Sequence, residues 1–232
     1  MDTFDAASSN FVPLGDSALL IVFGDRIDPA PNRRAIALSK ALADLPGVTD
    51  RVPAYASLTL HYDPGVWSHD GLVEAVMPYL ADEGGTVLED RHLRIPVCYG
   101  GAHGPDLDEV ARHCGLTPDE VIARHSGGEY LVYFLGFTPG FAYLGGLDPD
   151  LAMPRRDTPR SSVPAGAVGI AGEQTGIYPQ ASPGGWRLIG RTPLRLFDPL
   201  REPPCLLAPG DRLRFVPIGA DEFEWRMRGK DR

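Results

Sequence analysis

Arginine side chains gather in a Gly- and Pro-rich stretch of the sequence, from Phe134 to Pro193, where aromatic residues stand between the breakers. Guanidinium groups bind carboxylate and phosphate groups through paired hydrogen bonds. We therefore expect the binding chemistry of this chain to be directed at an anionic ligand. The candidate residues for contacting such a ligand, or for shaping the wall around it, are Arg155, Arg156, Arg160, Arg187, Arg191, Phe141, Tyr143, Gln174 and Trp186.

Two interpretations of this stretch remain open. In the first, the glycines and prolines are corners of a β-barrel and the rings fill the barrel interior. In the second, the stretch is a rigid wall that brings backbone N–H groups, rings and arginines to a ligand at little ordering cost. We favour the second, because corners alone do not explain why positive charge is concentrated among rings: residues 151–200 hold six arginines and three acids in a chain of net charge −9.

The small number of lysines excludes several kinds of catalytic site. Neither Lys40 nor Lys230 lies in a GxxxxGK[ST] phosphate-binding loop, and neither has the context of an amidase lysine. No GxSxG nucleophile motif exists, so Ser161 and Ser162 are assigned to backbone hydrogen bonding in a loop. The catalytic residues therefore stay unassigned.

Composition limits the partners and the compartment. A net charge of −9 argues against nucleic acid as a partner, because phosphate contacts need a basic face. The three cysteines and six histidines are scattered without metal-ligand spacing, so we expect no metal site. No apolar stretch is long enough to cross a membrane, and the polar segment 1–10 does not resemble a secretory signal. We expect a cytoplasmic protein.

The first ninety residues alternate between short apolar runs and amphipathic stretches. Apolar runs predict strands at 17–23, 47–53, 56–63 and 93–99, and helical spacing predicts helices at 31–45 and 69–82. This order predicts a ferredoxin-like βαββαβ unit. The helical stripe expected to face its core comprises Ala35, Leu38, Leu42 and Leu45.

Two short helices and a set of short strands follow. The helices are expected near 106–115, ending at Gly115, and 117–128, beginning with Thr117 and Glu120 as a capping box. Acids in their first turns are assigned to the helix dipole and not to catalysis. From Glu129 onward, short apolar segments between Gly and Pro corners predict an antiparallel barrel or sandwich, and 206–218 is expected to form its closing hairpin. We predict an α+β chain with an N-terminal domain at 1–90, a barrel domain with a helical connector at 91–220, and a charged tail at 221–232.

Three long segments carry a resemblance to a known family: "FLGFTPGFAYLGGLD", "MPRRDTPRSSVPAGAVGIAGEQTGIYP" and "SPGGWRLIGRTP". They resemble the KipI/PxpB family, and the resemblance continues to "PLGDSALLIVFG" near the N-terminus. It implies an N-terminal α+β domain and a C-terminal cyclophilin-like β-barrel. Members of the family are known as the B subunit of ATP-dependent 5-oxoprolinase or as allophanate hydrolase subunit 1; the absence of amidase machinery disfavours the second activity.

The resemblance also implies partners and a co-substrate. It implies a C subunit with a related cyclophilin-like barrel and an A subunit, which together with this chain would open 5-oxoproline to glutamate. ATP would be used by the complex, at a site on this chain or on a partner. Two other roles stay open: inhibition of a histidine kinase, as by KipI, and an acceptor-side carboxyltransferase module of a biotin-dependent, urea-type carboxylase.

Overall fold

The computed structural model describes residues 11–81 and 91–229, which divide into two compact units with a boundary between Glu89 and Asp90. Segment 1–10, which was expected not to be a secretory signal, and Asp82, the expected end of the second helix, lie outside the described residues. Each unit is described by itself below. No described helix is both long enough and apolar enough to span a membrane.

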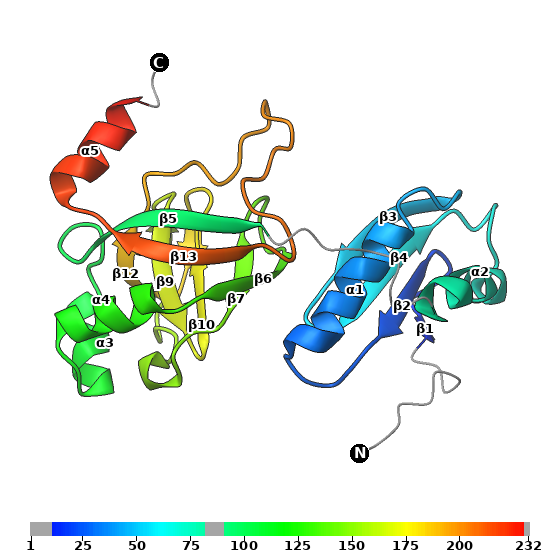
Figure 1. The fold of residues 1–232 in the computed structure, drawn as a ribbon, viewed down its shortest axis with the longest axis horizontal. Helices are drawn as coiled ribbons and strands as arrows, with labels where there is room; N and C mark the ends of the chain where they lie inside the picture. Colours follow the sequence, from blue (N-terminus) through cyan, green and yellow to red (C-terminus); the bar gives the residue numbers. More distant parts are fainter. Residues whose placement is uncertain (1–10, 82–90, 230–232) are drawn as a thin grey trace. The chain divides into compact units, whose positions relative to one another are not determined.

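The first unit is a four-stranded antiparallel sheet with two helices (Figure 1). The strands lie in the order β1-β2-β4-β3. The elements are β1 (Phe11–Pro13), β2 (Ala18–Val22), α1 (Pro29–Ala41), β3 (Val48–Pro53), β4 (Ser57–Tyr62) and α2 (His69–Ala81).

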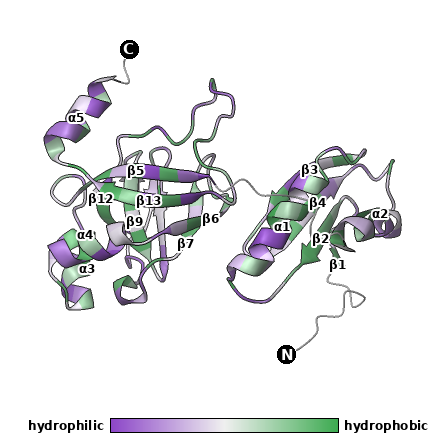
Figure 2. Ribbon diagram, in the orientation of Figure 1, coloured by the Kyte–Doolittle hydropathy of each residue, from purple (hydrophilic) through white to green (hydrophobic). Residues whose placement is uncertain are grey.

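The apolar stripe of α1 packs against alternate residues of the two central strands. Asp28 begins the helix, because its side chain accepts a hydrogen bond from the backbone N–H of Ala30 at 2.7 Å. The predicted stripe is confirmed: Ala35, Leu38 and Leu42 are buried and Leu45 is half-buried. Figure 2 shows that α1 has both hydrophilic and hydrophobic residues, as expected for a helix with one buried face.

The predicted ferredoxin-like order is wrong in its last strand. Segment 93–99 belongs to β5 (His92–Tyr99), which pairs with two strands of the second unit. The edge position beside β2 is taken instead by β1, which the sequence analysis missed. An apolar run indicates a strand but carries no information about which sheet the strand joins, and β1 is too short to show a period.

The second unit contains a closed seven-stranded barrel in the order β10-β7-β6-β13-β5-β12-β9. Strands β8 and β11 form a separate two-stranded antiparallel sheet in the same unit. The elements after β5 are α3 (Leu107–Cys114), α4 (Pro118–Gly127), β6 (Tyr130–Leu135), β7 (Ala142–Gly145), the 3₁₀ turn η1 (Pro149–Leu151), β8 (Arg160–Val163), β9 (Ala167–Ala171), β10 (Gln174–Ile177), β11 (Ser182–Gly184), β12 (Arg187–Arg191), β13 (Arg212–Pro217) and α5 (Ala220–Arg228).

The barrel is confirmed, but it is not wholly antiparallel. Strand β13 pairs in parallel with β5, from Arg212 beside His92 to Pro217 beside Val97, and antiparallel with β6. The expected closing hairpin at 206–218 is therefore wrong, although the chain does turn into β13 there. Two parallel neighbouring strands need a long connection. The segment between the end of β5 at Tyr99 and the start of β13 at Arg212 makes up most of the second unit. The charged tail expected at 221–232 begins as α5.

Both connector helices form as predicted. Helix α3 ends at Gly115, whose φ of +67° is the left-handed conformation that glycine adopts freely. Helix α4 begins with the capping box: Thr117 accepts a hydrogen bond from the N–H of Glu120, and Glu120 accepts one from the N–H of Thr117. In Figure 1 the two helices lie together beside the barrel.

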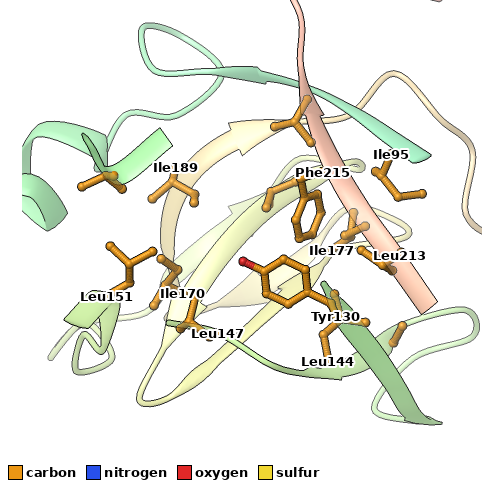
Figure 3. Close-up of a cluster of buried hydrophobic side chains, with 14 of the residues drawn as sticks. Ile95, Tyr130, Leu144, Leu147, Leu151, Ile170, Ile177, Ile189, Leu213 and Phe215 are labelled. Atoms are coloured by element: carbon orange, nitrogen blue, oxygen red, sulfur yellow. The ribbon is translucent and has the colours of Figure 1, made fainter. Parts of the chain in front are cut away.

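Large apolar side chains fill the barrel interior, among them Tyr130 and Phe215, which Figure 3 shows facing each other. A fully buried histidine, His125 of α4, lies in the same core and stacks on Phe215 at 4.4 Å between ring centroids. Its Nδ1 is 2.7 Å from the hydroxyl of Tyr99, and its Nε2 is 2.9 Å from that of Thr175. This buried polar chain is fully hydrogen-bonded.

Candidate functional site

The aromatic residues of the Gly- and Pro-rich stretch lie on the outer face of the barrel wall, not in its interior. Side chains alternate along each strand, so Ala142 and Leu144 of β7 join the interior core, whereas Phe141 and Tyr143 face outward. The interpretation that these rings fill the barrel is therefore wrong. They form a second, smaller core with Val163 of β8.

The rings in this outer core meet edge to face. Phe141 lies 5.1 Å from Tyr143, 5.6 Å from Tyr178 and 5.6 Å from Trp186, measured between centroids. Glycine makes the room: a Cβ on Gly176 would lie 3.0 Å from the ring of Trp186 and 3.2 Å from that of Phe141. The structure thus brings together three predicted residues and adds Tyr178, which was missed although it belongs to the same stretch.

Two of the predicted arginines meet at one buried carboxylate, Asp106, at the start of α3. The side chain of Asp106 is 5% exposed. Its Oδ1 accepts a hydrogen bond from Nη2 of Arg160 at 2.7 Å and lies 3.5 Å from Nη1 of Arg156, and its Oδ2 accepts from the backbone N–H of Leu188 at 2.7 Å. Asp106 therefore joins α3, strand β12 and the segment leading into β8.

The same arginines hold the loop that carries Trp186. The backbone N–H of Arg156 donates to the carbonyl of Gly185 at 2.8 Å, and Nη1 of Arg160 lies 3.4 Å from the carbonyl oxygen of Trp186. Arg156 and Arg160 are thus linked through the backbone of this loop to the ring of Trp186 and to the outer core. No local sequence signal identifies Asp106, because its partners Arg160 and Leu188 are 54 and 82 residues away along the chain.

Arg155 is exposed and takes part in no hydrogen bond or ion pair with the described residues. Burial raises the pKa of Tyr178, whereas the backbone N–H of Trp186, and then the positive charges of Arg155 and Arg160, act to lower it. These positive charges oppose the effect of burial on the pKa of Tyr178, whose side chain is buried in the outer core. The side chain of Arg160 is 23% exposed, and two of its five N–H groups contact Trp186 and Asp106.

The other two candidate arginines bind partners elsewhere in the unit, although Nε of Arg187 also lies 3.5 Å from the carbonyl oxygen of Pro154, next to Arg155 in the chain. Nη1 of Arg187 donates to both carboxylate oxygens of Glu109 at 2.7 Å. In the sheet Arg187 is the partner of Ile170, a residue of the interior core, so the two lie on the same face of the barrel wall. Arg191 donates to the carbonyl of Ala165 and lies over the ring of Phe223.

Gln174 lies at the edge of the outer core. It begins β10 and pairs with Ala171, a member of that core. Among the residues that the structure describes, no group of three or more His, Cys, Asp or Glu side chains is placed to hold a metal ion.

Comparison with known proteins gives the family. Residues 9–207 match the family model described as "Carboxyltransferase domain, subdomain C and D". A Bacillus subtilis (strain 168) protein, named as the B subunit of 5-oxoprolinase, is 46% identical over 223 residues, which are 90% of this chain and 93% of that protein. A protein of the same name from Escherichia coli O157:H7 is 46% identical over 88% of this chain and 94% of its own length. The chain belongs to the KipI/PxpB family.

Solved structures extend the comparison. A conserved uncharacterized protein, PH0987 from Pyrococcus horikoshii, is 47% identical to this KipI/PxpB chain, with a TM-score of 0.56, and the match covers 92% of this chain and 99% of that one. The protein TTHA0988 is 45% identical with a TM-score of 0.78; the match covers 88% of this chain but 40% of that longer one. The urea amidolyase of K. lactis, 20% identical with a TM-score of 0.76, shares the fold.

Proposed function

We propose that this chain is the B subunit of a heteromeric, ATP-dependent 5-oxoprolinase, which opens the lactam of 5-oxo-L-proline to L-glutamate together with an A and a C subunit. The observation that carries the proposal is the match to proteins named as the B subunit of 5-oxoprolinase, at 41–46% identity over 93–99% of their lengths. Relatives that match over nearly their whole length are a better guide to function than relatives that share one segment.

The outer face of the barrel offers chemistry that suits part of this reaction. A lactam is a stable amide and a poor electrophile, and phosphorylation of its oxygen by ATP would activate its carbon toward water. Both the carboxylate of the substrate and the transferred phosphoryl group carry negative charge, which arginine side chains can stabilise. The accessible guanidinium groups of Arg155 and Arg160 would supply that charge.

ATP and the partner subunits enter the proposal as requirements of the complex. We propose that ATP is used by the assembled enzyme, that the C subunit contributes a related barrel, and that this chain alone is inactive. In support, no Walker A loop and no amidase lysine occur in the sequence. The protein is expected to work in the cytoplasm.

Reconstitution tests the proposal directly. The chain is co-expressed with its neighbouring A and C subunits, and ATP-dependent formation of glutamate from 5-oxo-L-proline is measured with all three and with each one omitted. We expect activity only when all three are present. Activity that persists without this chain would remove the proposal.

A second candidate function, the acceptor-side module of a biotin-dependent carboxylase, has one specific observation in its favour. The family model is a carboxyltransferase domain, and the urea amidolyase of Saccharomyces cerevisiae is 30% identical over 131 residues. That match covers 51% of this chain, less than the 5-oxoprolinase relatives cover. A gene for a biotin carboxylase beside this one would favour the carboxylase, whereas an A-subunit gene would favour the oxoprolinase. Inhibition of a histidine kinase stays a prediction from the family resemblance; a host without such a kinase would dismiss it.

A further inference from the structure

Helix α5 is held against the barrel mainly by one side chain. Phe223 is buried and Met227 is half-buried, whereas the other seven residues of the helix are exposed, Trp225 to 71%. By contrast, the shorter helix α3 buries three side chains. In Figure 1, α5 lies beyond the end of β13, outside the ring of barrel strands. A nine-residue helix is not stable by itself in water, so α5 depends on this contact.

The ring of Phe223 contacts a histidine and an arginine of the barrel unit. Its centroid is 4.2 Å from that of His103, and the guanidinium carbon of Arg191 lies 5.8 Å from it. A turn after β5 fixes the backbone of His103, whose N–H donates to the carbonyl of Gly100 at 3.0 Å. Because both contacts are made through the ring of Phe223, the side chain can leave without breaking a hydrogen bond.

Two side chains of the barrel wall lie beneath α5. Val97 of β5 packs in the barrel interior, so Cys98 next to it faces outward, yet Cys98 is only 6% exposed. Arg191 of β12 is the antiparallel partner of Cys98. Since α5 contacts β5, and Phe223 contacts Arg191, the helix covers this pair. In agreement, burial and then the negative charge of Glu224 raise the pKa of the Cys98 thiol.

The backbone before α5 allows the helix to move as a unit. The N–H of Ile218 donates to the carbonyl of Val97 at 2.9 Å and so continues the pairing of β13 with β5. Gly219 follows, is exposed and has no side chain with which to cap α5. Apart from its chain neighbours, no heavy atom lies within 4 Å of the place that its Cβ would take. Rotation at this glycine is therefore unhindered, and the barrel need not unfold when α5 moves.

We propose that α5 is a displaceable cover: it leaves the barrel as a unit, turning about Gly219, and exposes Cys98 and Arg191 while the barrel stays folded. Local opening of this kind occurs in elements with few buried contacts. When α5 is docked, the guanidinium of Arg191 lies over a ring; when α5 is displaced, the guanidinium faces solvent and can meet an anion. The helix therefore controls access to Arg191. This inference goes beyond the proposed function and does not depend on it.

Chemical modification of the full chain tests the proposal. In a Cys114→Ser, Cys205→Ser background, the rate at which N-ethylmaleimide alkylates Cys98 is divided by the rate in urea, which gives the fraction of time that the thiol is accessible. Hydrogen exchange gives the same fraction for the amides of α5. We expect the two fractions to agree, and the amides of β5 to be at least about 100-fold better protected. Phenylglyoxal, located by mass spectrometry, should label Arg191 faster in every variant that displaces α5.

Two variants separate the ring of Phe223 from the rest of the helix. Phe223→Ala should raise both the alkylation of Cys98 and the exchange in α5 about 10- to 100-fold, the factor that follows from losing one buried phenylalanine side chain. Phe223→Leu keeps most of the buried surface, should raise both rates about 3- to 10-fold, and decides the matter if the alanine variant does not fold. Trp225→Ala is the matched control: it removes an exposed ring of the same helix and should change both rates less than about twofold.

Two results would overturn the inference. If Cys98 is alkylated no faster than the amides of β5 exchange, the thiol becomes accessible only when the barrel unfolds, and α5 is a fixed part of the unit. If Trp225→Ala accelerates alkylation as much as Phe223→Ala does, the helix frays without depending on the buried ring. Acceleration by Phe223→Ala with unchanged exchange in β5 supports displacement of α5 alone.

Discussion

Acidification from pH 7 to pH 5 is expected to destabilise the barrel unit by about 2 kcal/mol through one buried side chain, His125. Thr175 donates its only hydroxyl hydrogen to the carbonyl of Gly169 at 3.0 Å, so at its other contact it accepts the Nε2–H of His125. Nδ1 of His125 then accepts the hydroxyl hydrogen of Tyr99. Both ring nitrogens are used by the neutral imidazole, and among the contacts that the described residues make with the ring there is no carboxylate to stabilise a positive charge.

The magnitude follows from the pKa. Burial lowers the pKa of His125 from 6.5 to about 3. The unfolded chain therefore binds a proton between these two values while the folded chain does not, so the free energy of unfolding falls as the pH falls. This stability is fully present above about pH 6.5 and is lost progressively toward pH 3. At about 1.4 kcal/mol per pH unit the full loss approaches 5 kcal/mol, of which about 2 kcal/mol is lost by pH 5.

Urea unfolding at pH 7, 6 and 5 measures the effect. Because the two units can unfold separately, the transition is followed by hydrogen exchange in barrel peptides as well as by fluorescence. His125→Gln keeps an acceptor and a donor and should flatten the pH dependence, although loss of ring stacking lowers its stability at pH 7. His113→Gln, which removes an exposed histidine of α3, is the control and should keep the wild-type slope. Equal slopes for wild type and His125→Gln would refute the reasoning.

Three further changes test the elements around the site. Thr117→Ala removes the capping box of α4 and should cost about 1 kcal/mol of barrel stability, seen as a lower Tm in calorimetry; an unchanged Tm contradicts the role of the cap. Gly176→Val should cost about 1–3 kcal/mol and shift the fluorescence of Trp186, because the added carbons enter the space of that ring; an unaltered spectrum would place the ring elsewhere. A double-mutant cycle of Glu109→Ala and Arg187→Ala should give a coupling free energy of about 1 kcal/mol, and strict additivity of the two variants would show that the pair is not formed.

Local sequence patterns predicted the elements well because those elements obey local rules. The stripe of α1 and the capping box of α4 depend on residues three or four apart, which the sequence displays directly. The pairing of β5 does not depend on such local spacing. Its apolar run is equally suited to either unit, and its pairing with β13 joins residues about 120 positions apart. The ferredoxin-like prediction failed at that long-range step.

The sequence showed rings and arginines concentrated in one stretch, but not which of them meet in space. Arg160 and Trp186 do lie together, whereas Arg191 lies over Phe223. That these residues bind a ligand stays a prediction. Asp106 and Glu109 each bind an arginine, Arg160 and Arg187. The sequence did not reveal these pairs, because acids at the start of α3 are already explained by the helix dipole. A charge at a helix N-terminus can also neutralise a distant arginine, and only the fold shows which role it has.

The parallel pairing of β5 and β13 also has a consequence for synthesis of the protein. Strand β5 begins the barrel and β13 is its last strand, so β13 fills the gap between β5 and β6. A nascent chain that ends before Arg212 therefore leaves two unpaired strand edges, which favour aggregation. The ribosome must release nearly the whole second unit before the ring of strands can close, and its assembly is expected to be slow and sensitive to C-terminal truncation.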